Sequence, residues 1–539
     1  MIQLVSAHVV NETIFDVIIL VSDGVKSLSL LEDKYAEICC SLDDGNDWLI
    51  PAEKIPAKRV IYSSTGSIHG DFDDVRKYIK AGIAAGKRFL MTGARSPLLI
   101  TLPTERFPAA QICSAIGFLH SLYTPLLNRE KIENFVEKAD LIGILELKTK
   151  CQKFENFVPY GSLDDFLQGI QSSFNLCRDI GDGDPQRMSP SRVVDYILNE
   201  FKDSSIKINI VENKDQILKN YPLMAAVSRS ADNIEEHRAR LIWLEYIGEG
   251  EITETLFIVG KGVTIDTGGA NLKVGTSMYG MSRDKYGSAV LAGFFRALDI
   301  LKPTGIKVVG CMCMCRNSIG SNSFTTDEII TARSGKTIQI TNTDAEGRLA
   351  MADALAEMKE LALKARNPHL MTIATLTGHV VLSYGHCSAA MDNGPARAVN
   401  YAEQLKQTGD VFGQPVEVSR LFSEDFSFHS SDVQTAQLKQ SDIGPSVQTL
   451  RGHQGPAAFL ICASGLSECG LDSAHPIKYT HLDIGLVMGA YPQCSLPSPL
   501  LTLIAQFVFL EKIFWEKNFF SSHILPKTKF QEWEVKIIS

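Results

Sequence analysis

Short apolar segments alternate along this chain with longer segments whose apolar residues recur at helical spacing. In the second half, strands are expected at 254–259, 306–314, 337–340, 370–374 and 479–484, and helices at 284–301 and 344–366. Parallel strands need a crossover connection, which is usually a helix. The alternation therefore predicts an α/β fold whose central sheet is mostly parallel and covered by helices. Ligands of such sheets bind where strands end and helices begin.

The N-terminal part of the chain repeats this pattern on a smaller scale. Strands are expected at 16–21, 88–91 and 141–147, and helices at 73–85, 109–122 and 163–180. A loop rich in Gly, Asp and Pro follows, and Ser189 is expected to cap the next helix. The 539 residues are too many for one ordinary domain. We expect a smaller N-terminal α/β domain at 1–160, a linker helix and loop at 161–183, a larger C-terminal α/β domain at 184–510 and a tail at 511–539.

The composition is that of a folded protein, with 45% hydrophobic and 21% charged residues. The net charge of −9 and the lack of a long basic run give no electrostatic reason to bind nucleic acid or an anionic membrane. No stretch reaches the roughly 18 apolar residues that a membrane helix needs. The first residues do not have the pattern of a signal peptide. We therefore expect a cytoplasmic protein with no nucleic-acid or membrane partner.

The run CMCMC at 311–315 has two interpretations. Its three cysteines share one face of a strand and could form a soft-metal site. The two methionines occupy the other face, so both faces are apolar, which is typical of a central strand in a parallel sheet. Because cysteine packs readily as a small hydrophobic residue, we favour a buried strand.

Charged residues gather at three expected junctions of strand and helix. GKGVTIDTGG at 260–269 follows a strand, SRD at 282–284 opens a helix, and TNTDAEGRL at 341–349 joins a strand to a helix. These segments and the residues between them contain Lys261, Asp266, Lys273, Asp284, Asp344, Glu346 and Arg348. Four carboxylates at one sheet edge would repel one another, and two divalent cations roughly 3.5–4 Å apart would resolve that conflict. For a single residue such as Asp284 or Asp344, helix capping is the simpler interpretation; for the whole set, a shared site is favoured over chance.

Two segments suggest a phosphate-binding loop, GKG at 260–262 and SGKT at 334–337. A phosphate-binding loop of this type needs a glycine five residues before the Gly-Lys pair. Ile330 occupies that position for the second segment, and the first segment also lacks the spacing. We therefore reject nucleotide binding.

NTDAEGRL at 342–349, together with VGKGVTIDTGG at 259–269, resembles the signature pair of the leucyl aminopeptidases, the M17 metallopeptidases. SRD at 282–284, ATLTG at 374–378 and HLDI at 481–484 extend the resemblance, which covers residues 189–505. VTIDTGG followed by MYGMSRD is most similar to the probable aminopeptidase-like branch of the family. The resemblance implies a two-metal enzyme that removes apolar, leucine-like residues from the N-termini of peptides. It also implies a homo-oligomer, a hexamer.

The resemblance assigns a role to each residue of the motifs. One divalent cation, Zn²⁺ or Mn²⁺, would be held by Lys261, Asp266, Asp284 and Glu346, and a second by Asp266, Asp344 and Glu346. Lys273 and Arg348 would be catalytic, with a bicarbonate ion at Arg348. Met281, Thr375, Leu376 and Gly378 would contact the substrate. A lysine that ligates a metal must give up its proton, so Lys261 is expected to be neutral there.

Several positions depart from the family pattern. Lys285 and Tyr286 follow the Asp of SRD, where relatives have a small apolar residue and a glycine. Tyr286 must then either point outward or push its helix away from the metals. Arg316 stands where the family generally has Glu, and His379 where a small residue is usual. His379 and His386 could be additional metal ligands, although structural histidines are the commoner case. These departures leave an alternative function open, that of a catalytically impaired paralogue that serves as a binding or structural protein.

Overall fold

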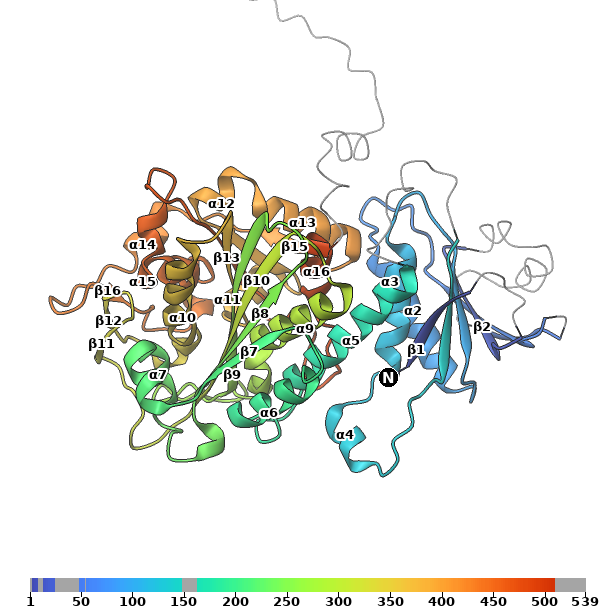
Figure 1. Cartoon of the computed structure of the whole chain (residues 1–539), viewed down its shortest axis with the longest axis horizontal. Helices are drawn as coiled ribbons and strands as arrows, with labels where there is room; N and C mark the ends of the chain where they lie inside the picture. Colours follow the sequence, from blue (N-terminus) through green and yellow to red (C-terminus); the bar gives the residue numbers. More distant parts are fainter. Residues whose placement is uncertain (1, 8–12, 25–47, 54, 148–161, 509–539) are drawn as a thin grey trace, which may run out of the picture.

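The computed structural model describes residues 2–7, 13–24, 48–53, 55–147 and 162–508. The expected tail at 511–539 lies outside these residues. Two large sheets, each accompanied by helices, form the two main parts of the molecule, and α5 (Leu163–Gly181) lies between them (Figure 1). The predicted α/β class is thereby confirmed. No helix among the described residues is both long enough and apolar enough to cross a membrane.

The N-terminal sheet has six strands in the order β1-β6-β5-β2-β4-β3. Their bounds are β1 (Gln3–Ala7), β6 (Leu141–Leu145), β5 (Pro97–Thr101), β2 (Val17–Ser22), β4 (Arg59–Ser64) and β3 (Trp48–Pro51). All neighbours are parallel except β3, which is antiparallel to β4. The helices of this part are α2 (Arg76–Leu90), α3 (Ala110–Leu122) and α4 (Leu126–Lys131).

The prediction of a strand at 88–91 is wrong. This segment is the last turn of α2, and the strand beside β2 is β5 instead. In the short run RFLM only Phe89 is buried, whereas Leu90 and Met91 are exposed, as at the end of an amphipathic helix. Every residue of β5 is buried, which is the burial that a central parallel strand requires.

The larger sheet has eight strands in the order β15-β14-β17-β13-β9-β10-β8-β7. Their bounds are β15 (Val416–Val418), β14 (Ser388–Asp392), β17 (Lys478–Asp483), β13 (Pro368–Ala374), β9 (Glu254–Asp266), β10 (Ile306–Asn317), β8 (Arg240–Ile247) and β7 (Lys207–Val211). The four central strands, β17 to β10, are parallel, while β14 and β8 are antiparallel to their inner neighbours. The mostly parallel sheet predicted from the alternation is confirmed.

The next two strands along the chain after β9 that join this sheet lie on opposite sides of β9. From β9 the chain passes through α9 (Tyr286–Leu301) to β10 on one side, and then through α10 (Glu346–Ala362) to β13 on the other side. The cores show that α9 and α10 lie on opposite faces of the sheet. Such a reversal opens a crevice at the carboxyl end of the strands, where α/β proteins bind their ligands.

The alternation in β10 separates the two cores of the larger part. Cys311, Cys313 and Cys315 lie in the core beneath α10, whereas Met312 and Met314 lie in the core beneath α9. All five side chains are fully buried. The buried central strand predicted from CMCMC is confirmed, and the soft-metal alternative is not.

A small third sheet contains the segment that suggested a phosphate loop. Its strands are β11 (Ile329–Thr331), β12 (Thr337–Gln339) and β16 (Leu438–Lys439). SGKT at 334–337 lies in the turn between antiparallel β11 and β12 and at the start of β12. A phosphate-binding loop joins a strand to a helix, so this hairpin agrees with the rejection of nucleotide binding.

The remaining helices complete the larger part. They are α6 (Pro190–Glu200), α7 (Lys214–Asn220), α8 (Pro222–Ser228), α11 (Gly378–Tyr384), α12 (Gly394–Ala398), α13 (Tyr401–Phe412), α14 (Ser423–Ser427), α15 (Gln454–Ala463) and α16 (Leu500–Val508). Ser189 precedes α6 as predicted, but its side chain makes no capping hydrogen bond.

Candidate active site

One cleft of about 690 Å³ is lined by all eleven residues to which the family resemblance assigned a role. They are Lys261, Asp266, Lys273, Met281, Asp284, Asp344, Glu346, Arg348, Thr375, Leu376 and Gly378. The cleft lies at the carboxyl end of β9, where the strand order predicts a crevice.

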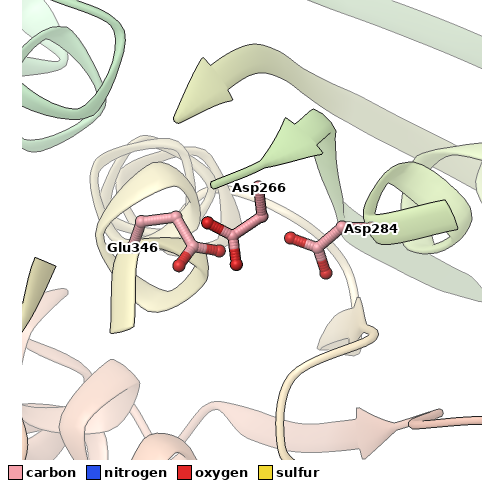
Figure 2. A group of neighbouring side chains, drawn as sticks. All are labelled: Asp266, Asp284 and Glu346. Carbon is pink, nitrogen blue, oxygen red and sulfur yellow. The ribbon is translucent and has the colours of Figure 1, made fainter. Parts of the chain in front are cut away.

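Three buried carboxylates converge in this cleft from three different elements. Asp266 ends β9, Asp284 lies in the 3-10 helix η4 (Met281–Lys285), and Glu346 begins α10. One oxygen atom of each lies within 4.8 Å of the others, and Figure 2 shows the three groups side by side. The fourth acid, Asp344, lies in the 3-10 helix η5 (Thr343–Ala345), directly before α10.

The capping interpretation of Asp284 and Asp344 is wrong. The residue that caps α9 is Lys285 and the one that caps α10 is Ala345, and neither makes a side-chain capping bond. The Asp344 N–H instead donates to the side chain of Asn342 at 2.9 Å. Neither aspartate side chain is therefore engaged by the start of its helix.

Lys261 lies within β9 and its Nζ is 2.7 Å from Asp284 Oδ1 and 2.9 Å from Glu346 Oε1. It also donates to the carbonyl of Thr375 at 2.9 Å. Burial disfavours the charged amine, but the adjacent carboxylates outweigh this effect, and the pKa of Lys261 is raised above its ordinary value. Among the protein groups alone Lys261 is an ammonium, so the expected neutral amine applies only to a metal-bound site. Gly347 leaves room for this side chain, because a Cβ there would lie 2.5 Å from Lys261 Cε.

Lys273 links the other pair of acids. Its Nζ is 2.9 Å from Asp266 Oδ2 and 2.5 Å from Asp344 Oδ1. Burial opposes the charge here too, and the two carboxylates again prevail, so the pKa of Lys273 is raised. A lysine that stays protonated beside the carboxylates is suited to stabilise negative charge that develops on a substrate.

The acids carry more negative charge than the two lysines satisfy. Burial is the main cause that raises the pKa of Asp344 to about 7, with a further contribution from Asp266. Burial likewise raises the pKa of Asp284 well above its ordinary value. Asp284 Oδ2 is buried without a hydrogen-bond partner, which is costly for a carboxylate oxygen. Clustered carboxylate oxygens with an unsatisfied acceptor are a donor set that fits divalent cations.

Arg348 also lines this cleft. Its side chain is buried, and Nη1 donates to the carbonyl of Gln440 at 3.0 Å, while Nε has no hydrogen-bond partner. Burial lowers the pKa of Arg348 to about 10, so the guanidinium remains charged at neutral pH. A buried guanidinium with an unused donor fits a small anion such as bicarbonate.

The sequence model of the cytosol aminopeptidase family, catalytic domain, matches residues 175–495. This chain belongs to the cytosol aminopeptidase family. It is 52% identical over 459 residues to "Putative aminopeptidase W07G4.4" of Caenorhabditis elegans, covering 85% of this chain and 86% of that protein. It is 30% identical over 350 residues to "Probable cytosol aminopeptidase" of Prochlorococcus marinus (strain MIT 9211), covering 64% of this chain and 65% of that protein.

Solved structures show the same fold at lower sequence identity. The apo structure of leucyl aminopeptidase from Trypanosoma cruzi has a TM-score of 0.75 at 19% identity, covering 92% of this chain and 93% of that one. The bottromycin maturation enzyme BotP in complex with Mn has a TM-score of 0.70 at 19% identity, covering 91% of this chain and 98% of that one.

Membership of the cytosol aminopeptidase family makes this chain a metallo-exopeptidase, as the motifs predicted. The resemblance to leucyl aminopeptidases is confirmed. No comparison supports the alternative of an impaired paralogue.

The two departures beside Asp284 do not enter the cleft. Tyr286 is fully buried, and its hydroxyl lies 2.6 Å from Ser495 Oγ. Lys285 is also fully buried, and its Nζ donates to the carbonyls of Gly183, at 2.7 Å, and Ser282. Burial lowers the pKa of Lys285 to about 7. Tyr286 thus neither points outward into solvent nor enters the group of carboxylates.

The other departures form contacts of their own. Arg316 donates to Ser318 Oγ at 2.8 Å. The Nδ1 atoms of His379 and His453 are 2.7 Å apart, and His386 Nδ1 lies 3.0 Å from the carbonyl of Leu486. In the described part of the chain, neither His379 nor His386 belongs to the group of acids that could hold a metal.

Sequence reasoning assigned no role to two residues that hold other parts of the site in place. Asn317, which ends β10, donates its Nδ2 to Asp266 Oδ1 at 2.8 Å and to the carbonyl of Thr343 at 3.1 Å. Asp483, which ends β17, accepts from Leu376 N at 3.2 Å and from Thr377 Oγ1 at 2.6 Å. Both are polar residues at the ends of apolar strands, and that position was the available signal.

Proposed function

We propose that this chain is a two-metal aminopeptidase that removes apolar, leucine-like residues from the N-termini of peptides. The observation that carries the proposal is the convergence of Asp266, Asp284 and Glu346, with an unsatisfied buried oxygen on Asp284. The cleft that contains them is large enough for part of a peptide. The structure of BotP in complex with Mn supports a divalent cation in this fold.

Lys261, Asp266, Asp284 and Glu346 would hold one cation, and Asp266, Asp344 and Glu346 the second. When bound, two divalent cations supply Lewis acidity to the scissile carbonyl and lower the pKa of a water molecule. Zn²⁺ and Mn²⁺ both accept such a set of oxygen and nitrogen donors.

The side chains around these ligands would position the peptide. The α-amino group of the substrate would lie near Asp284, which restricts cleavage to the first residue. Met281, Leu376 and Gly378 line the cleft beside the acids and would receive an apolar first side chain. Thr375 is held at both its side chain and its backbone, because its hydroxyl donates to Asp284 Oδ1 at 2.9 Å and its carbonyl accepts from Lys261.

Two cationic residues would act on the reacting atoms. The raised pKa of Lys273 keeps it protonated, so it can donate to the oxyanion that forms when the carbonyl is attacked. Arg348 would hold a bicarbonate ion, for which its unpaired Nε is available. The two residues therefore divide the stabilisation of negative charge between the substrate and a bound anion.

The test combines metal content with turnover. The purified protein is expected to bind two Zn²⁺ or Mn²⁺ ions per chain and to hydrolyse leucine amide. Asp344→Ala should remove one ion and lower kcat by at least about 100-fold, since a displaced reacting group already costs that much. Asp472→Ala is the control, because Asp472 is an exposed aspartate outside the cleft. A folded protein that binds no metal and hydrolyses no amide would instead support the alternative of a binding or structural protein.

We also propose that the protein is a cytoplasmic hexamer. The name of the Prochlorococcus marinus relative, "Probable cytosol aminopeptidase", supports the compartment. Light scattering should then give a mass of about six times the 59.3 kDa of the chain. A monomer mass at working concentrations would contradict this part of the proposal.

A further inference from the structure

The first turn of α9 is held between the sheet and α5. On the sheet side, Gly287 approaches so closely that a Cβ would collide with the carbonyl of Ile373 and lie 2.9 Å from Lys261 N. On the opposite side Tyr286 lies against the C-terminal end of α5. A Cβ on Gly181 would lie 2.5 Å from Cδ2 of the Tyr286 ring. Figure 1 shows α5 and α9 lying side by side, and their contact is among the most extensive between helices.

A chain of hydrogen bonds joins Tyr286 to the loop that follows α5. Ser495 Oγ donates to Asp182 Oδ2 at 2.9 Å, so the Tyr286 hydroxyl must be the donor in its 2.6 Å contact with Ser495 Oγ. The backbone N–H of Ser495 donates to the same Asp182 oxygen at 3.0 Å. The other Asp182 oxygen lies 3.0 Å from Arg283 Nε, next to Asp284 in the chain.

Lys285 makes a second connection between the same two segments. Its Nζ bonds the carbonyl of Gly183 in the loop and the carbonyl of Ser282 within η4. Its side chain has no exposed area. Because the N–H groups of Lys285 bond both carbonyls, η4 cannot move relative to the loop without leaving a buried polar group unpaired, which is costly.

We infer that Gly181, Lys285 and Tyr286 are positioning residues, through which the end of α5 fixes the place of Asp284 in the active site. The inference rests on the proposed role of Asp284 as a metal ligand. Tyr286 is accommodated by Gly181, more than a hundred positions earlier in the chain, and Lys285 is held by the carbonyl of Gly183. They therefore form a support for the site and do not displace it.

Loss of these contacts is expected to weaken metal binding, because Asp284 is held from two sides. Contacts from the sheet side, Lys261 Nζ at 2.7 Å and Thr375 Oγ1 at 2.9 Å, reach only its Oδ1. The backbone of η4 is held from the other side by the contacts of Tyr286 and Lys285. Loss of groups that orient a metal ligand typically weakens metal binding about 10- to 100-fold.

The test adds one methyl group at the contact. Gly181→Ala is expected to displace the Tyr286 ring and weaken the binding of Mn²⁺, titrated calorimetrically into metal-free full-length protein, about 10- to 100-fold. Gly169→Ala is the matched control in the same helix. Its Cβ would lie 3.0 Å from Cδ2 of Leu301, the movable end of a side chain, so Mn²⁺ affinity should stay within about twofold of the wild type.

A second variant tests the contact itself. Gly181→Ala combined with Tyr286→Ala should bind Mn²⁺ more tightly than Gly181→Ala alone, because the colliding ring is gone. Urea unfolding of each variant measures stability separately from affinity.

Should Gly181→Ala fail to fold, Ser495→Ala takes its place. It removes the two hydrogen bonds of Ser495 Oγ, with the Tyr286 hydroxyl and with Asp182, without adding atoms. Mn²⁺ should bind at least about 3- to 10-fold more weakly, which is the effect expected for one lost hydrogen bond. Wild-type affinity in folded Gly181→Ala, or in Ser495→Ala, would overturn the inference. Absence of Mn²⁺ binding by the wild-type protein would instead overturn the proposed function, so the two failures are distinguishable.

Discussion

Asn317 fixes one oxygen of Asp266 and leaves the other to Lys273. Oδ1 of Asp266 accepts from Asn317 Nδ2 at 2.8 Å and from Gly268 N at 2.9 Å. Asn317→Ala should therefore weaken Mn²⁺ binding about 10- to 100-fold, since Asp266 loses a group that orients it. Calorimetric titration of the metal-free variant measures the change. The control is Asn322→Ala, at an exposed loop position, and equal affinities for the two variants would contradict the assignment.

His481 gives a pH dependence that is separate from the carboxylates. It is fully buried, its Nδ1 lies 2.7 Å from Thr372 Oγ1, and burial lowers the pKa of His481 to about 3. The unfolded chain takes up a proton at this residue near pH 6.5, whereas the folded chain stays neutral until about pH 3. The stability that neutral His481 contributes is therefore present above pH 6.5 and is lost as the pH falls.

The comparison of His481→Asn with the wild type isolates this effect. When the pH is lowered from 7.5 to 5.5, the unfolding free energy of the wild type should decrease by about 1.4 kcal/mol more than that of the variant. Urea unfolding of both metal-free proteins at the two pH values measures it. A difference that does not change with pH would show that His481 titrates alike in the folded and unfolded chains.

At the scale of single elements, the burial of β10 predicts that its cysteines are protected from chemical modification. Burial raises the pKa of the Cys311 and Cys315 thiols well above the ordinary value, and their side chains have no exposed area. N-ethylmaleimide should leave the cysteines of 306–317 unmodified in the native protein and modify them after unfolding in urea. Peptide mass spectrometry reads the result, with exposed Cys494 as the internal control. Modification of β10 in the native protein would contradict a central buried strand.

The elements that could be predicted are those with a long, regular pattern. The strands β9, β10, β13 and β17 and the helices α9 and α10 follow from apolar periodicity, and the alternation in CMCMC predicted which of its residues share a face of the sheet. The segment 88–91 failed because four residues cannot distinguish a strand from the end of an amphipathic helix. The strand expected at 337–340 exists as β12, but its place in a separate small sheet depends on pairing with distant residues.

The residues of the site also divide into those that could be predicted from the sequence and those that could not. Residues inside contiguous motifs, such as Asp266 and Glu346, could be singled out because their spacing is visible in the chain. Asn317 and Gly181 could not, because their effect depends on contacts between segments that only the fold brings together. The orientation of Tyr286 was undetermined for the same reason.

At the scale of the whole molecule, Asp179 joins the N-terminal part to the larger part. It lies in α5 and is buried, and it accepts from the hydroxyls of Tyr123 and Tyr196, each at 2.7 Å. It also pairs with Arg129. Tyr123 and Arg129 belong to the N-terminal part, whereas Tyr196 lies in α6, so this one carboxylate holds groups from both sides of the molecule.

Asp179→Leu should therefore loosen the connection between the two parts. Removing one partner of a largely buried ion pair costs about 3–5 kcal/mol, and two tyrosine hydroxyls lose their acceptor as well. We expect the variant to unfold in urea at lower concentration and in two separated transitions, because each part keeps its own sheet. Asp140→Ala is the matched control, since it breaks an Arg–Asp pair with Arg95 that is exposed and lies within the N-terminal part. Water and salt screen an exposed pair so that it contributes little to stability, and this variant should therefore unfold like the wild type. If Asp179→Leu unfolds in one transition at the wild-type midpoint, the two parts are held together by other contacts.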